Sequence, residues 1–185
     1  MAQRRHHYER AFENYLRARR IPYIAVDEAK KTLLPDRAPL RIENDSKTEQ
    51  LTLKSFDFVI YGGRANFLID VKGRRVPRNL TSPLARGRLE SWVTQDDVDS
   101  MRQWERLFGR GFEGAFLFIY WCEGQPPDAL FQEMFEDRGR WYAIRVVRAN
   151  AYFEHMRVRS PRWRTVHLAA TDFERLSQPL LEAAR

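Results

Sequence analysis

The chain has 185 residues, 43% of them hydrophobic and 31% charged, and its 32 Lys and Arg against 25 Asp and Glu give a formal net charge of +7. This composition excludes a wholly disordered chain, and the length suits one domain with a substantial core. There is no apolar run of transmembrane length and no hydrophobic signal region after the N-terminal arginines. We therefore expect a single cytoplasmic domain over residues 1–185 that does not associate with membranes. The basic balance favours a polyanionic partner, although an excess of arginine can also reflect genome composition.

Apolar side chains recur at helical spacing in residues 5–20 and predict the first helix, which ends before Ile21-Pro22. Glu9 and Glu13 lie one turn apart on one face of this helix. They form a solvated acidic edge, or one of them reaches a site elsewhere in the fold. His6 and His7 have no second histidine at ligand spacing, so we interpret them as helix-start residues and not as metal ligands. Cys122 is the single cysteine, which excludes a disulfide within the chain and a zinc knuckle.

Two apolar runs, Leu53–Tyr61 and Asn66–Val71, are joined through paired glycines and predict a β-hairpin. Asp57 interrupts the first strand, and Asp70 and Lys72 interrupt the second. Because side chains alternate along a strand, Asp70 and Lys72 share a face. A loop with an even number of residues would bring Asp57 to that face, directly or diagonally opposite Asp70. An odd loop would place Asp57 on the other side.

Two carboxylates on adjacent strands repel each other, so either one is protonated or a cation lies between them. Oxygen ligands with room for water suit Mg²⁺ or Mn²⁺ better than zinc. Lys72 could neutralise the pair or orient a water or a phosphate oxygen, as metal-assisted phosphodiester hydrolysis requires. An Asp-x-Lys tripeptide alone is common by chance, so a strand-edge aspartate beside a surface ion pair is the competing interpretation.

Residues 73–88 combine arginines with prolines and glycines and predict a mobile basic loop that leaves the hairpin. Its arginines, including Arg74, Arg75, Arg86 and Arg88, would make sequence-independent contacts with a phosphate backbone. A solvated loop without a partner is the alternative.

The remaining elements follow from periodicity and capping signals. We interpret the five tryptophans as core or platform residues and not as base-stacking ones. In chain order we expect a short strand at Tyr23–Val26, a polar loop over 27–50, a helix opening at Thr94-Gln95-Asp96-Asp97 with Thr94 as its cap, a central strand at Ala115–Cys122, a strand at Trp141–Val147, a helix at Ala149–Met156, a strand at Trp163–Leu168, and a terminal helix at Asp172–Leu181 capped by Thr171.

The order of these features resembles the PD-(D/E)xK nuclease superfamily, in particular the archaeal Holliday junction resolvases. Its helical acid, strand acid, acid-x-lysine motif and helix glutamine match Glu9, Asp57, Asp70-Val71-Lys72 and Gln95 in that order. The resemblance covers about the first two-thirds of the chain. It implies an α/β, restriction-endonuclease-like αβββαβ core over about residues 1–122, with a mixed central sheet flanked by helices. Strand and helix additions would then occupy about residues 123–185.

Two features qualify the resemblance. No proline precedes Asp57, and either Glu9 or Glu13 could be the helix acid, with Glu9 preferred for its spacing to the following strand. The opening His7-Tyr8-Glu9-Arg10-Ala11-Phe12-Glu13 also resembles the signature of the bacterial HYExAFE family, which has no established activity. That second resemblance supports a role for the helix glutamates but implies no substrate.

The resemblance implies a nuclease that hydrolyses phosphodiester bonds in nucleic acid, DNA in preference to RNA, including branched or junction DNA. Asp57, Asp70, the carbonyl of Val71 and Glu9 would bind Mg²⁺ or Mn²⁺. Lys72 would orient the attacking water or stabilise charge on the phosphate, and Gln95 would hold the water or Lys72. Symmetric cleavage of a junction would require a homodimer. The alternatives are a non-catalytic nucleic-acid-binding module, or a structural domain, on the same fold.

Overall fold

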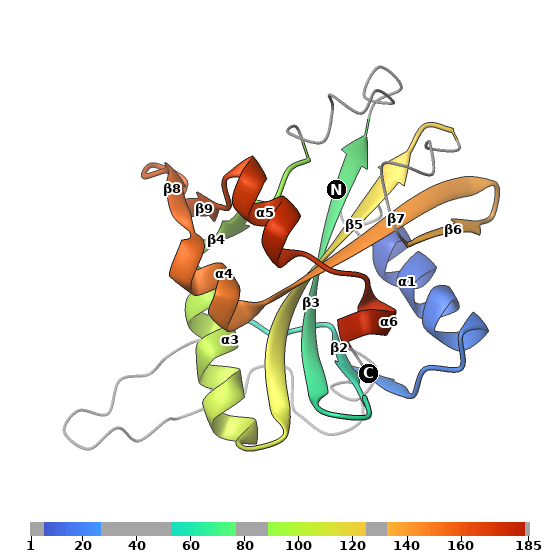
Figure 1. Cartoon of the computed structure of the whole chain (residues 1–185), viewed down its shortest axis with the longest axis horizontal. Helices are drawn as coiled ribbons and strands as arrows, with labels where there is room; N and C mark the ends of the chain where they lie inside the picture. Colours follow the sequence, from blue (N-terminus) through green and yellow to red (C-terminus); the bar gives the residue numbers. More distant parts are fainter. Residues whose placement is uncertain (1–5, 27–52, 77–88, 125–132, 184–185) are drawn as a thin grey trace.

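The computed structural model describes residues 6–26, 53–76, 89–124 and 133–183. Two sheets and several helices make up this part of the chain (Figure 1). The elements are α1 (His6–Ala18), β1 (Tyr23–Ala25), β2 (Phe58–Ile60), β3 (Asn66–Val76), β4 (Val93–Thr94), α3 (Gln95–Phe108), β5 (Phe112–Cys122), β6 (Met134–Asp137), β7 (Arg140–Arg148), α4 (Ala149–His155), β8 (Arg157–Ser160), β9 (Thr165–His167), α5 (Ala170–Leu176) and α6 (Leu180–Ala183).

The larger sheet has six strands in the order β1-β2-β3-β5-β7-β6 and is mixed, because β3 and β5 run parallel while the other neighbours are antiparallel. Strand β5 lies inside it and is almost entirely buried, as its apolar run predicts. Its alternate residues divide between two cores. Helices α1 and α6 cover one face, while α3, α4 and α5 cover the other, which makes three layers. The order α1-β1-β2-β3-α3-β5 confirms the predicted restriction-endonuclease-like core.

The hairpin formed by β2 and β3 has the register that brings its acids together. Ile60 pairs with Phe67, which leaves the six residues 61–66, an even number, in the loop. The paired register ends at Phe58 and Ile69, and the N–H of Asp57, just before β2, donates a 2.8 Å hydrogen bond to the carbonyl of Ile69, next to Asp70. The second strand is longer than predicted, because β3 continues through Gly73 to Val76. The prediction that the basic loop begins at residue 73 is therefore wrong. Its later part, residues 77–88, lies outside the described residues, as do residues 27–50.

The C-terminal third contributes to the same sheet, since β7 pairs with β5 along its length. The short strands β4, β6 and β8 were not predicted. Helix α5 begins at Ala170, after the cap residue Ala169, so the predicted cap at Thr171 is wrong. The predicted terminal helix is also interrupted, because Gln178 exchanges backbone hydrogen bonds with Val146 and Pro179 follows it. No helix in the described ranges is long and apolar enough to cross a membrane.

Candidate active site

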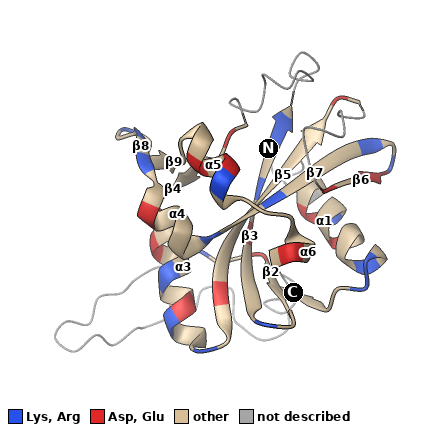
Figure 2. Ribbon diagram, in the orientation of Figure 1, with Lys and Arg blue, Asp and Glu red and all other residues tan. Residues whose placement is uncertain are grey.

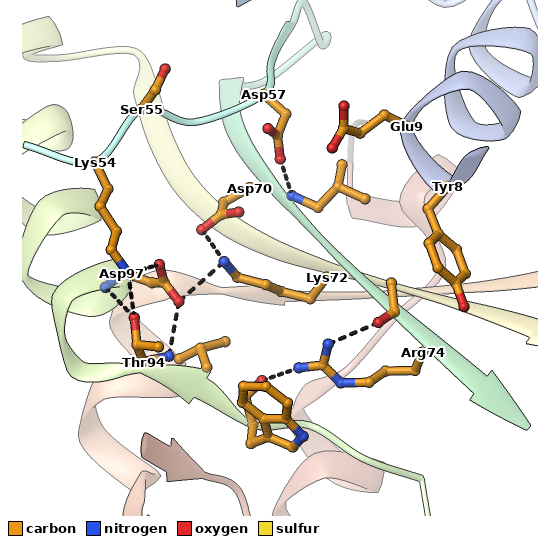
Figure 3. Close-up of a pocket in the computed structure, with 14 residues that line it drawn as sticks. Tyr8, Glu9, Lys54, Ser55, Asp57, Asp70, Lys72, Arg74, Thr94 and Asp97 are labelled. Atoms are coloured by element: carbon orange, nitrogen blue, oxygen red, sulfur yellow. Dashed lines mark hydrogen bonds and ion pairs between the residues drawn. The ribbon is translucent and has the colours of Figure 1, made fainter. Parts of the chain in front are cut away.

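The sheet opens on one side of β3, and a cavity of about 450 Å³ lies at this opening (Figure 3). Strand β2 begins at Phe58, which pairs with Ile69, so no strand among the described residues pairs with β3 on that side from Asp70 onward. Helix α1 approaches the opening from one face of the sheet, and the start of α3 approaches from the other. The cavity is lined by Tyr8, Glu9, Lys54, Ser55, Asp57, Asp70, Val71, Lys72, Gly73, Arg74, Trp92, Val93, Thr94 and Asp97.

The carboxylates of Asp57 and Asp70 both line the cavity near the point where β2 meets β3. The backbone N–H of Val71, exposed at the open strand edge, donates a 2.6 Å hydrogen bond to Oδ2 of Asp57. The N–H and C=O of one strand residue point to the same side, so the Val71 carbonyl also faces the opening. Glu9 reaches from α1 toward Asp57 (Figure 3). Acids from two strands and one helix thus surround one opening.

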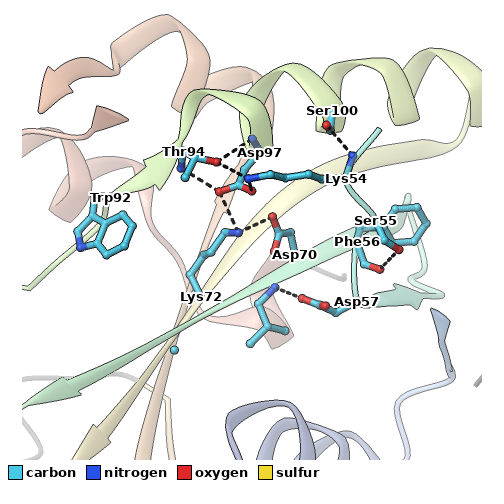
Figure 4. Close-up of polar contacts among 12 residues, drawn as sticks. Lys54, Ser55, Phe56, Asp57, Asp70, Lys72, Trp92, Thr94, Asp97 and Ser100 are labelled. Atoms are coloured by element: carbon cyan, nitrogen blue, oxygen red, sulfur yellow. Dashed lines mark hydrogen bonds and ion pairs between the residues drawn. The ribbon is translucent and has the colours of Figure 1, made fainter. Parts of the chain in front are cut away.

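Lys72 lies between two carboxylates from different elements. Its Nζ is 2.8 Å from Oδ2 of Asp70 and 3.1 Å from Oδ2 of Asp97. Lys54 contacts the other oxygen of Asp97 at 3.0 Å and donates to the hydroxyl of Thr94 at 2.8 Å (Figure 4). The result is an alternating chain of charges in the order Asp70, Lys72, Asp97, Lys54.

The start of α3 holds Asp97 in place. Thr94 caps the helix by accepting a hydrogen bond from the backbone N–H of Asp97, and the carboxylate of Asp97 accepts one from the N–H of Thr94. This reciprocal arrangement is a capping box. It confirms the predicted cap at Thr94 and directs the Asp97 carboxylate toward Lys72.

Burial and charge pairing divide the acids into two kinds. Burial and the neighbouring Asp70 raise the pKa of Asp57 to about 8, against the lowering effect of the Val71 N–H. Burial also raises the pKa of Asp70, although Lys72 opposes the rise. The pKa of Asp97 shifts in the opposite direction. Burial would raise it, but Lys72 and the hydrogen bonds from Thr94 outweigh burial and lower this pKa to about 2. Asp57 therefore holds a proton at neutral pH, whereas Asp97 is a stable anion.

Lys72 keeps its charge in this environment. Burial alone would lower its pKa, but the carboxylates of Asp70 and Asp97 overcome that effect and raise the pKa above the ordinary value. A permanent ammonium can donate hydrogen bonds to water or to a phosphate oxygen, and it cannot act as a base at neutral pH.

The structure brings together most of the residues that the sequence singled out. Glu9 lines the cavity, whereas Glu13 bonds to Arg17 and Tyr23 outside it. Of the two helix acids, the geometry therefore selects Glu9, as the sequence spacing favoured.

Gln95 does not line the cavity, because its side chain donates to Asp99 on the same helix at 3.0 Å. Asp97, two residues later, lines the cavity in its place. The sequence singled out neither Asp97 nor Lys54 as a site residue. The Thr-x-x-Asp capping signal places Asp97 in the first turn of α3, but no local signal indicates that this turn faces β3.

The predicted phosphate-binding arginines are divided by the strand. Arg74 lines the cavity and donates to the carbonyls of Gly73 and Trp92. Arg75 lies on the opposite face, pairs with Glu123, and does not line the cavity. Arg86 and Arg88 lie outside the described residues.

Tyr8, within the residues that resemble the HYExAFE signature, closes the cavity against β3. Its ring packs so tightly on Gly73 that a Cβ at that glycine would lie 2.2 Å from ring atom Cδ2. Only glycine permits this approach without displacing the ring. The contact brings α1, and with it Glu9, close to the open edge.

The donor atoms at the opening suit a hard divalent cation, since they are carboxylate and carbonyl oxygens. The pKa values of Asp57 and Asp70 are raised, so a positive charge bound at this place would stabilise the two carboxylates in their deprotonated form. Within the described ranges, however, no group of three or more His, Cys, Asp or Glu side chains is arranged to hold a metal ion. In the arrangement observed, Lys72 pairs with Asp70, so a cation would compete with Lys72 for that carboxylate.

The fold is restriction-endonuclease-like, with a curled mixed sheet between helices. Among solved structures, the chain is similar to Hjc, a Holliday junction resolvase from the archaeal hyperthermophile Archaeoglobus fulgidus, with a TM-score of 0.51 and 13% sequence identity. The similarity spans 97% of this chain and 98% of Hjc, so it extends beyond the first two-thirds that carry the motif. At this identity it shows the fold alone.

The chain matches no protein-family model and no curated protein sequence. The resemblance of residues 7–13 to the HYExAFE signature therefore stays a prediction.

Proposed function

We propose that the protein is a metal-dependent nuclease that hydrolyses phosphodiester bonds in nucleic acid. One observation carries the proposal: Glu9, Asp57 and Asp70 line one cavity at the open edge of β3, where Lys72 lies 2.8 Å from Asp70. Two carboxyl groups with raised pKa values at a solvent-accessible opening are costly to the fold, and such sites are often functional.

The residues of the opening have distinct roles in this proposal. Asp57, Asp70 and the carbonyl of Val71 would hold Mg²⁺ or Mn²⁺, with Glu9 completing the set. The bound cation supplies Lewis acidity and a water that is more acidic than bulk water. Lys72 donates hydrogen bonds to the attacking water or to the phosphate oxygens as negative charge grows on them. Asp97 keeps Lys72 charged and in place when Asp70 turns toward the cation.

The substrate is proposed as DNA in preference to RNA, with branched or junction DNA included because Hjc is described as a Holliday junction resolvase. Cleavage of a junction at two symmetric positions would require two copies of the chain, so a homodimer forms part of this proposal. Arg74, on the cavity wall, would contact the phosphate backbone.

The test is cleavage of a panel of branched, single-stranded and duplex DNA and RNA substrates in the presence of Mn²⁺. Asp70→Asn should abolish cleavage while leaving the far-UV circular dichroism spectrum unchanged. Asp99→Asn is the matched control, because it makes the same substitution on the exposed side of α3. The site assignment would be wrong if Asp70→Asn still cleaved the substrates. It would also be wrong if Asp99→Asn lost as much cleavage as Asp70→Asn.

The alternative is a nucleic-acid-binding module without catalysis, and one contact favours it. Lys72 already neutralises Asp70 and Asp97, so these acids have a counter-ion without a metal. Calorimetric titration with Mn²⁺ separates the two cases. Heat of binding that is present in the wild type and absent in Asp57→Asn supports the nuclease. Binding to DNA with no metal uptake and no cleavage supports the module.

A further inference from the structure

The hairpin formed by β8 and β9 carries four arginines within residues 157–164, together with Trp163 at its turn. Trp163 is 70% exposed, which makes it the most exposed large hydrophobic side chain among the described residues. Val158 on the same hairpin is 67% exposed. A tryptophan this exposed contributes little to folding, although its indole offers a large flat apolar surface. The ribbon of β8 is partly blue, the colour of Lys and Arg, in Figure 2.

The hairpin is fastened to the rim of the cavity by backbone and side-chain contacts. The carbonyl of Arg164 accepts a 2.8 Å hydrogen bond from the N–H of Gln95, the first residue of α3. Strand β9 pairs with β4, and both residues of β4, Val93 and Thr94, line the cavity. The hairpin therefore stands next to the end of the cavity where Asp97 lies.

A row of guanidinium and indole groups joins the cavity to the hairpin. The guanidinium of Arg74 lies 4.1 Å from the ring of Trp92, and both residues line the cavity. Arg159, on β8, approaches the same ring at 5.2 Å. At the turn, Arg162 lies 5.4 Å from the ring of Trp163. We call these five residues, Arg74, Trp92, Arg159, Arg162 and Trp163, the hairpin track.

Three of the four hairpin arginines have an acidic partner. Arg157 pairs with Asp172 at 3.7 Å, Arg159 with Glu90 at 3.4 Å, and Arg164 with Asp96 at 3.0 Å. Their side chains remain 43–67% exposed, and ion pairs this exposed are weak because water screens them. Phosphate groups could replace the acids at little cost.

Positive charge alternating with aromatic rings is the combination that binds single-stranded nucleic acid, in which phosphates meet guanidinium groups and bases stack on rings. In a duplex the base faces are covered by neighbouring base pairs, so an exposed indole can stack only on an unpaired base. The charge selects a polyanion, and the exposed ring selects one with accessible bases.

We propose that the hairpin track binds an unpaired segment of nucleic acid adjoining the cavity, with one base stacked on Trp163. The segment passes along Arg74, Trp92 and Arg159 toward the turn. This assignment rests on the proposed function in taking the cavity as the place of cleavage. It adds that the substrate has a single-stranded portion next to the cleaved bond.

The experiment measures binding of fluorescein-labelled oligothymidylate of about 15 nucleotides by anisotropy, in EDTA so that no cleavage occurs. Trp163→Ala should weaken binding by about tenfold, as expected for the loss of one base–aromatic stack. Trp163→Phe, which keeps a stacking ring, should restore most of the affinity. Because Trp163 is exposed, we expect all three proteins to unfold at similar temperatures.

A charge-matched pair of variants tests the electrostatic part. Arg162→Gln should lower affinity for the oligonucleotide and reduce the slope of log affinity against log salt by about 0.7. Arg106→Gln is the control, because it removes the same charge from an exposed position in the last turn of α3. It should lower the affinity and the salt slope less than Arg162→Gln does.

Three results would overturn the proposal: no binding of the oligonucleotide by the wild type, unchanged binding by Trp163→Ala, or an equal loss on a blunt duplex. The last result would show that the hairpin contacts the backbone and not unpaired bases. All measurements are made without metal, so the hairpin can bind normally in a protein that fails to cleave. Conversely, a protein that cleaves but binds independently of Trp163 would lose only the hairpin assignment.

Discussion

Replacing Asp57 by asparagine should change how the stability of the metal-free protein depends on pH. The pKa of Asp57 is about 8 in the folded chain, against an ordinary value of 3.8 that applies when the chain is unfolded. Between these values the folded state holds a proton that the unfolded state has lost. The free energy of unfolding must therefore fall as pH rises, by at most about 1.4 kcal/mol per pH unit for one proton.

From pH 5 to pH 7 this amounts to a loss of about 2–3 kcal/mol in the wild type. Asp57→Asn removes the titration but keeps a side-chain oxygen that can accept the Val71 N–H. The free energy of unfolding of the variant should consequently fall less from pH 5 to pH 7. The difference between variant and wild type should therefore shift in favour of the variant as pH rises.

Urea unfolding in EDTA at pH 5, 6 and 7, followed by circular dichroism, measures the effect. Asp99→Asn, at an exposed position of α3, is the control and should run parallel to the wild type. Parallel curves for the wild type and Asp57→Asn would refute the reasoning, because they would show that Asp57 releases its proton at the same pH in both states.

Three further predictions concern the surroundings of the site. Millimolar Mn²⁺ should raise the melting temperature of the wild type more at pH 7 than at pH 5, because carboxylates bind metal when deprotonated, and an equal rise at both pH values would argue against carboxylate ligation. Gly73→Ala should destabilise the fold by about 1–3 kcal/mol in urea, since its Cβ meets the Tyr8 ring, and Tyr8→Ala in the same chain should recover part of the loss. Unchanged stability in Gly73→Ala would mean that the ring is not held there. Thr94→Ala should lower the free energy of unfolding by about 1 kcal/mol, because the helix loses its cap, whereas Thr94→Ser should keep the cap. An equal loss of stability in both variants would show that the hydroxyl does not stabilise the helix.

Much of the fold could be predicted from periodicity and turn signals. The helix over residues 5–20 and the capped helix after Thr94 were predicted close to their observed bounds, and the hairpin around Gly62-Gly63 was predicted with a first strand that is too long and a second that is too short. The errors arise from contacts between distant segments. Strand β3 runs on through Gly73 because it pairs with β5 as far as Val76, and a basic composition conceals that pairing. The terminal helix breaks because Gln178 bonds to a distant strand.

The candidate site was predictable only where its residues are close in the chain. Alternation alone places Asp70 and Lys72 on one face, while the meeting of Asp57 with Asp70 depended on whether the loop was even or odd. Spacing gave a preference for Glu9 over Glu13 on α1, whereas the acid from α3 was not singled out, because that helix carries several acids. Asp97 in particular has no motif of its own beyond the capping box.

The sequence by itself determined the longer helices, the β2–β3 hairpin and the charged residues that interrupt its apolar runs, because these properties depend on residues a few positions apart. Only the tertiary structure decided that β2 starts late enough to leave an open edge on β3. It also decided that Glu9 and Asp97, and neither Glu13 nor Gln95, line that opening. Which acids line the opening depends on how two helices pack on opposite faces of one sheet. Local periodicity does not predict packing between segments that are distant in the chain.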